Sequence, residues 1–83
     1  IIMIEKKIIK ILEENIKDSK IFIQDITGNN NHFNLIVIAS VFDGLTMIQQ
    51  HKVIYKLLDS MITKEIHALQ IKTLTWEQWK KEN

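Results

Sequence analysis

The side chains best suited to chemistry in this sequence are its three histidines, His32, His51 and His67. An imidazole can act as a proton acceptor or as a metal ligand near neutral pH. The chain has no cysteine, which excludes disulfide bonds and any metal site built from its own thiolates. Each histidine could instead be a hydrogen-bonded structural residue, because histidine is intermediate in burial. The sequence around each histidine is therefore needed to distinguish a metal-binding or acid–base role from a structural one.

The remaining polar residues do not follow the spacing of a familiar catalytic motif. The sequence has no glycine-rich phosphate loop, no HExxH pattern and no zinc-finger spacing. No serine is placed on an elbow ahead of a histidine base. Adjacent carboxylates such as Glu13 and Glu14 fall on the polar side of an expected helix. A chain this short also seldom forms a deep pocket. We therefore expect no enzymatic activity and assign no catalytic residue.

The position of His67 follows from the pattern around it. Apolar residues alternate from Ile66 to Ile71, which is the period of a strand, so His67 stands near the start of that strand. The pattern changes at Thr75, which is followed three residues later by Gln78. This pair is typical of a capping box and predicts that a short final helix begins there.

His32 is expected where a hairpin loop meets a strand. Isoleucine and leucine recur at helical spacing from Ile1 to about Lys17 and predict an amphipathic helix. A strand over Lys20–Ile26, the polar loop Thr27–Asn31 and a strand over His32–Ala39 follow, which together read as a hairpin. The glycine and asparagines of the loop predict a mobile connection beside His32.

His51 falls inside a second helix. The segment Phe42-Asp43-Gly44 interrupts the sheet, and Thr46 with Gln49 predicts the helix start through another capping box. A broad apolar face is expected on this helix, formed by Met47, Ile48, His51, Ile54, Tyr55, Leu58, Met61 and Ile62.

The predicted order is helix, strand, strand, helix, strand, helix within a single domain over residues 1–83. The first two strands should pair antiparallel, and the third should return parallel after its helical crossover. We therefore expect an α+β fold, a three-stranded mixed sheet with helices packed mainly on one face. Its predicted core comprises Ile8, Ile11, Ile21, Ile23, Leu35, Val37, Ile54, Leu58, Leu69 and Ile71.

The composition is that of an ordinary globular domain. Hydrophobic residues make up 46% of the chain and charged residues 25%, and the net charge is +1. All the basic residues are lysines, although bidentate recognition of guanine or phosphate favours arginine. We expect nucleic acid to be an unlikely partner and the isolated chain to be monomeric.

No stretch of the sequence is long enough to span a bilayer. The longest mainly apolar run, Leu35 to Phe42, is far below the about 20 residues that a helical span needs. Charged residues interrupt the aliphatic ones near the N-terminus, so no signal peptide is expected there. We expect no membrane association, and we leave a cytosolic and a mitochondrial location open.

Several short motifs together resemble the BolA-like family. Their order and spacing match from about residue 20 to residue 79. The motifs are His32-Phe33, Phe42-Asp43-Gly44, Gln50-His51-Lys52-Val53-Ile54-Tyr55, Ile66-His67-Ala68-Leu69, Lys72-Thr73 and Trp79. The resemblance implies a class II KH-like fold, in agreement with the predicted order of elements.

The resemblance also implies a partner and a cofactor. Proteins of this family pair with monothiol glutaredoxins of the CGFS type, sharing a [2Fe-2S] cluster with the glutaredoxin and glutathione. His67 matches the family's C-terminal histidine ligand, and His32 best matches the variable loop ligand, with His51 as the remaining candidate. Neutral imidazole can ligate iron beside the thiolates of another protein. We expect no cluster tightly bound to the isolated chain, and a role in cluster trafficking or iron homeostasis.

The alternative is a KH-like nucleic-acid-binding transcriptional regulator. A KH module grips a single strand with a GxxG loop. The two glycines here, Gly28 and Gly44, are too far apart to form one. Gln50 also stands where the family often has arginine, and the lysines are interleaved with acidic residues.

Overall fold

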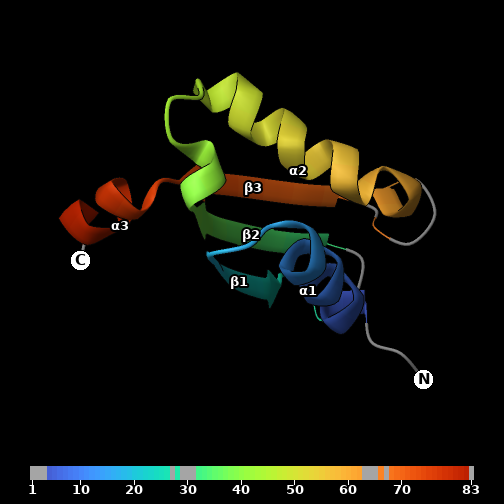
Figure 1. Cartoon of the computed structure of the whole chain (residues 1–83). Helices are drawn as coiled ribbons and strands as arrows, with labels where there is room; N and C mark the ends of the chain where they lie inside the picture. The colour runs from blue at the N-terminus through green and yellow to red at the C-terminus, as the bar shows by residue number, and fades with distance from the viewer. Residues whose placement is uncertain (1–3, 27, 29–31, 63–65, 67, 83) are drawn as a thin grey trace.

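The computed structural model describes residues 4–26, 28, 32–62, 66 and 68–82 (Figure 1). The predicted order of helices and strands is confirmed. Their bounds are α1 (Ile4–Asn15), β1 (Ser19–Asp25), β2 (His32–Ala39), a short 3₁₀ helix η1 (Ser40–Phe42), α2 (Met47–Ile62), β3 (Ala68–Leu74) and α3 (Trp76–Glu82). None of these helices combines the length and the apolar character needed to cross a bilayer.

The three strands form one mixed sheet with β2 at its centre. β1 pairs antiparallel with β2, and β3 pairs parallel with β2 after the crossover through α2. Helices α1 and α2 lie side by side on one face of the sheet (Figure 1). The opposite face is called the open face below. The predicted α+β architecture is therefore confirmed.

The core lies between the sheet and the pair α1 and α2. Every predicted core residue belongs to it, either fully buried or packed against its buried members. The prediction omitted several further buried residues, namely Leu12, Ile16, Phe33, Ala39, Phe42, Met61 and Ile66.

Both predicted capping boxes are present. The Thr46 backbone N–H donates to Gln49 Oε1 at 2.9 Å, and the Gln49 N–H donates to Thr46 Oγ1 at 3.2 Å. At α3 the Thr75 N–H donates to Gln78 Oε1 at 2.9 Å, and the Gln78 N–H donates to Thr75 Oγ1 at 3.1 Å. These bonds satisfy backbone groups that a helix start leaves without intrahelical partners, so each box fixes where its helix begins.

The broad apolar face predicted for α2 is wrong at its N-terminal end. Met47 and Ile48 are both 69% exposed and Tyr55 is also exposed, whereas Gln50 is 5% exposed. The buried stripe is narrower and consists of Gln50, Ile54, Leu58 and Met61. The Gln50 side chain can be buried because its Nε2 donates to the Leu45 carbonyl at 3.1 Å.

The short helix α3 covers the far end of the open face. Ile38 and Leu74, which are paired across β2 and β3 on that face, are both buried there. The ring of Trp79 lies 5.5 Å from the ring of Phe22, centroid to centroid. The indole Nε1 of Trp76 donates to the Asp18 carbonyl at 3.0 Å. These contacts attach the C-terminal helix to the start of β1 and leave the rest of the open face uncovered.

Candidate functional site

His32 is the first residue of β2, and its side chain belongs to the open face. Side chains alternate along a strand, and the odd-numbered residues from Phe33 to Ala39 are buried in the core, so the even-numbered ones point the other way. His32 is half-buried. Its carbonyl accepts a hydrogen bond from the Ile26 N–H at 2.9 Å, which extends the pairing of β1 and β2. A histidine at this place is held by a strand rather than by a loop.

The prediction for His67 falls on a residue outside the described part of the chain. Its neighbour Ala68, the first residue of β3, pairs directly with His32. Since β2 and β3 are parallel, both strands begin at the same end of the sheet. Most of the loop predicted over Thr27–Asn31 also lies outside the described residues. Within it, the Gly28 N–H donates to Asp25 Oδ1 at 3.0 Å.

His51 lies at the other end of the molecule from His32. It is half-buried and lines a hollow of about 270 Å³ between the start of α2 and the end of β3, beside Thr73 and Leu74. Thr73 is five residues along β3 from Ala68, which corresponds to about 16 Å of extended strand. The structure therefore does not bring His51 together with His32.

The hollow beside His51 also contains a buried hydroxyl. Thr73 is 6% exposed, and its Oγ1 has no hydrogen-bond partner among the described residues. A buried polar group without a partner costs about 1–3 kcal/mol, whereas an apolar group of the same shape avoids that cost. We therefore expect that removing this hydroxyl would not weaken the fold.

Replacing Thr73 with valine should stabilise the protein by about 1 kcal/mol, because the methyl group fills the same space without needing a partner. In a domain of this size that gain raises Tm by about 4–8 °C, which thermal unfolding followed by far-UV circular dichroism would detect. Thr75→Val is the matched control, because Thr75 Oγ1 caps α3, and its loss should destabilise by about 1 kcal/mol. A lower Tm for Thr73→Val would contradict the expectation.

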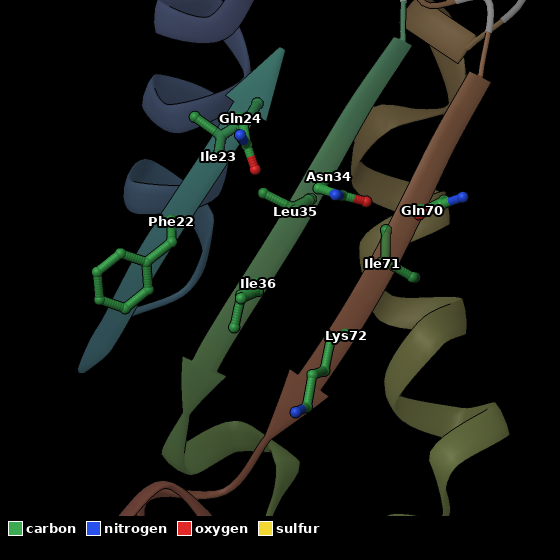
Figure 2. Close-up of a pocket in the computed structure, with 9 residues that line it drawn as sticks. All are labelled: Phe22, Ile23, Gln24, Asn34, Leu35, Ile36, Gln70, Ile71 and Lys72. Atoms are coloured by element: carbon green, nitrogen blue, oxygen red, sulfur yellow. The ribbon is translucent and has the colours of Figure 1, made fainter. Parts of the chain in front are cut away.

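Next to His32 on the open face stands a row of three carboxamides, one from each strand (Figure 2). Gln24 pairs with Asn34, and Asn34 pairs with Gln70. Asn34 lies two residues after His32 on the same side of β2. The alternating polar residues of the three strands were a signal for this row, but the sequence alone does not say which residues stand opposite each other.

The surroundings of the row are nearly neutral. The next row towards α3 consists of Phe22, Ile36 and Lys72, and the amine of Lys72 is 2.9 Å from Glu82 Oε1. Across the part of the chain that the structure describes, no three His, Cys, Asp or Glu side chains form a group suited to a metal ion. A metal bound at the His32 end would therefore need ligands from a second molecule, or from residues beyond those described.

Comparison with known proteins identifies relatives over almost the whole chain. The family model described as BolA-like protein matches residues 3–78. An uncharacterized protein of Buchnera aphidicola subsp. Schizaphis graminum is 41% identical over 80 residues, covering 95% of this chain and 96% of the relative. The DNA-binding transcriptional regulator BolA of Haemophilus influenzae is 34% identical over 56 residues, covering 68% of this chain and 54% of that protein.

The fold has solved counterparts as well. A bolA protein homologue from Coxiella burnetii superimposes with a TM-score of 0.77 at 26% identity, covering 95% of this chain and 99% of that one.

Proposed function

The chain belongs to the BolA-like protein family, and on that basis we propose that it shares a [2Fe-2S] cluster with a monothiol glutaredoxin of the CGFS type. His67 and His32 are the ligands that this chain contributes. The protein acts as a binding partner in cluster trafficking or iron homeostasis and catalyses no reaction of its own. Glutathione supplies a further ligand together with the glutaredoxin.

The observation that carries this proposal is the pairing of His32 with Ala68 at the shared start of β2 and β3. Adjacent Cα atoms in a chain are about 3.8 Å apart, and paired strands are about 4.8 Å apart. In the sequence His67 directly precedes Ala68, and this adjacency supports its assignment as the second ligand beside His32. Because the side chain of His32 belongs to the open face, it can meet a metal that arrives with a second protein.

The donor set fits a shared cluster. The chain has no thiolate to offer, and a neutral imidazole binds iron through a ring nitrogen. Cysteine ligation by the partner and glutathione completes the coordination of the two irons. Exchanging thiolate for imidazole makes the cluster less negative and raises its reduction potential. His32, which is held on β2, and His67, which precedes β3 in the sequence, are the two imidazoles proposed for that exchange.

Reconstitution of the complex tests the proposal directly. The protein is mixed with a CGFS glutaredoxin, glutathione, iron and sulfide under anaerobic conditions, and visible absorption and circular dichroism spectra are recorded. A spectrum that differs from that of the glutaredoxin alone, together with a 1:1 heterocomplex by size-exclusion chromatography, is the expected result. A spectrum that stays that of the glutaredoxin alone would remove the proposal.

The competing function is regulation of transcription through DNA binding. Its support is the name of the Haemophilus influenzae relative, the DNA-binding transcriptional regulator BolA. The charge of this chain argues against it, because the net charge is +1 and arginine is absent. Phosphate contacts dominate affinity for nucleic acid, and they need a gathered set of cations.

We expect binding to duplex or single-stranded DNA to be no tighter than about 10⁻⁴–10⁻⁶ M at physiological salt, the range of non-specific binding. Fluorescence anisotropy with labelled oligonucleotides of several sequences measures this. Titrations at several salt concentrations provide the control, since a phosphate-driven complex weakens steeply as salt rises. Submicromolar, sequence-dependent binding at physiological salt would favour the regulator instead.

A further inference from the structure

The row of carboxamides on the open face has unused hydrogen-bonding capacity. Gln24, Asn34 and Gln70 stand opposite one another on three neighbouring strands, so the row spans about 10 Å across the sheet. In the part of the chain that the structure describes, none of these side chains forms a hydrogen bond, either with another member of the row or with any other group. The row therefore presents uncharged donors and acceptors to whatever covers the open face.

The row lies in a hollow of the open face that is bounded on one side by aromatic rings. The hollow measures about 360 Å³, and its lining includes all three carboxamides together with Phe22 and Ile36 (Figure 2). Towards α3 it is bounded by the ring of Phe22, against which Trp79 packs. In the other direction the next residue of β2 on this face is His32, so the hollow lies beside the proposed ligand His32.

We propose that the carboxamide row binds the main-chain amide groups of a short extended peptide segment of the protein that docks at the His32 end. This inference rests on the proposed function, since that partner is the glutaredoxin. A carboxamide carries an N–H donor and a C=O acceptor, as a peptide group does, so the two are complementary in either orientation. The volume is at the lower end of the range for binding sites, which suits a segment of only a few residues.

The residues that line the hollow also determine the polarity and charge of the peptide segment that it can bind. Phe22 and Ile36 provide an apolar part of the lining on the side towards α3, and Phe22 is 40% exposed. An apolar side chain of the segment covers this part of the lining, while its neighbouring peptide groups lie over the carboxamides. Among the described residues that line the hollow none carries a carboxylate, and Lys72 at its margin already contacts Glu82. The segment is therefore uncharged where it crosses the row.

A nucleic acid strand fits this surface less well than a peptide does. The Nζ of Lys20 lies 5.3 Å from the ring centroid of Phe22 and 5.8 Å from that of Trp79. Lys72 is engaged by Glu82, 2.9 Å away. Both lysines nearest the row thus already interact with other side chains, and phosphates crossing it would lack the cations that dominate nucleic-acid affinity.

The test separates docking from cluster ligation. The triple variant Gln24→Ala, Asn34→Ala, Gln70→Ala keeps both proposed ligands, and its affinity for the cluster-free glutaredoxin is measured by isothermal titration calorimetry. We expect Kd to rise at least tenfold, while the spectrum of the cluster complex at saturating concentrations stays that of the wild type. Lys56→Ala, an exposed substitution on α2, is the control and should leave Kd unchanged.

A second measurement uses the unmodified chain and so does not depend on how the variant folds. The side-chain NH₂ signals of the three row residues are followed in ¹⁵N-HSQC spectra during titration with glutaredoxin, and again with single-stranded oligothymidine at physiological salt. We expect these signals to shift with the glutaredoxin and to stay in place with the oligonucleotide.

The outcomes distinguish the two proposals. A wild-type heterocomplex whose Kd is unchanged in the triple variant, with unshifted NH₂ signals, overturns the docking site and leaves the cluster function standing. Shifts caused by the oligonucleotide instead of the protein overturn the peptide assignment. A wild type that forms no heterocomplex at all, with or without cluster, removes the shared-cluster function and the docking site with it.

Discussion

Replacing His67 with alanine should abolish the visible spectrum of the mixed cluster while leaving the fold intact. The chain has no cysteine that could take over as a ligand, and an alanine side chain offers no donor atom. An Fe–N bond is only about 2 Å long, close to the value for zinc, so a histidine elsewhere cannot substitute without moving the backbone. Visible circular dichroism of the reconstituted heterocomplex measures the loss, and far-UV circular dichroism checks the fold.

Two matched variants, at His32 and His51, test whether the loss of the spectrum is specific to His67. His32→Ala should alter the spectrum or make the cluster labile without preventing complex formation, because His32 pairs with Ala68 at the same end of the sheet. His51→Ala should leave the spectrum unchanged, because His51 lines a hollow with Thr73 and Leu74 at the other end of β3. A heterocomplex whose spectrum survives His67→Ala would refute the ligand assignment.

Phe33→Ala should lower the free energy of unfolding by about 3–5 kcal/mol, the usual cost of truncating a buried phenylalanine. Phe33 is fully buried on the central strand and belongs to the core beneath α1 and α2. Small domains are stable by about 5–15 kcal/mol, so the variant loses a large part of its stability. Urea unfolding followed by far-UV circular dichroism measures the change.

Phe22→Ala is the control, since it removes the same side chain from the opposite face of the neighbouring strand. Phe22 is exposed, and one of its contacts is with Trp79, so its truncation should cost much less than that of Phe33. Equal losses for the two variants would mean that the open face contributes as much to stability as the core does.

The hydrophobic pattern was sufficient to predict the order of elements, and the core residues it indicated are confirmed, although it left the inward face of each strand open by one residue. On β3, Leu69 and Ile71 alternate with the exposed residues Gln70 and Lys72, whereas on β2 the residues between Leu35 and Ala39 are apolar on both faces, with Ile36 half-buried and Ile38 buried. The two capping boxes could also be predicted from the sequence alone. A threonine and a glutamine three residues apart bond to each other's backbone, and these bonds do not depend on the rest of the fold.

Features that depend on the relative placement of elements were beyond the sequence. Met47 and Ile48 continue the apolar pattern of α2, but the helix begins where the core does not reach, and a helical period carries no information about that. Likewise, Gln24, Asn34 and Gln70 are unremarkable singly and form a row only through the registers of two strand pairs. The proximity of His32 to the start of β3 depends on the same register.

The attachment of α3 determines what the intrinsic fluorescence of this protein reports. Both tryptophans of the chain, Trp76 and Trp79, belong to this one short helix. The first bonds to the Asp18 carbonyl and the second stacks near Phe22, so emission follows the docking of the C-terminal helix and not the core. If α3 detaches before the sheet melts, as a terminal segment can, fluorescence will give an earlier midpoint than circular dichroism. The gap between the two midpoints would show how much less stable the docking of α3 is than the sheet itself.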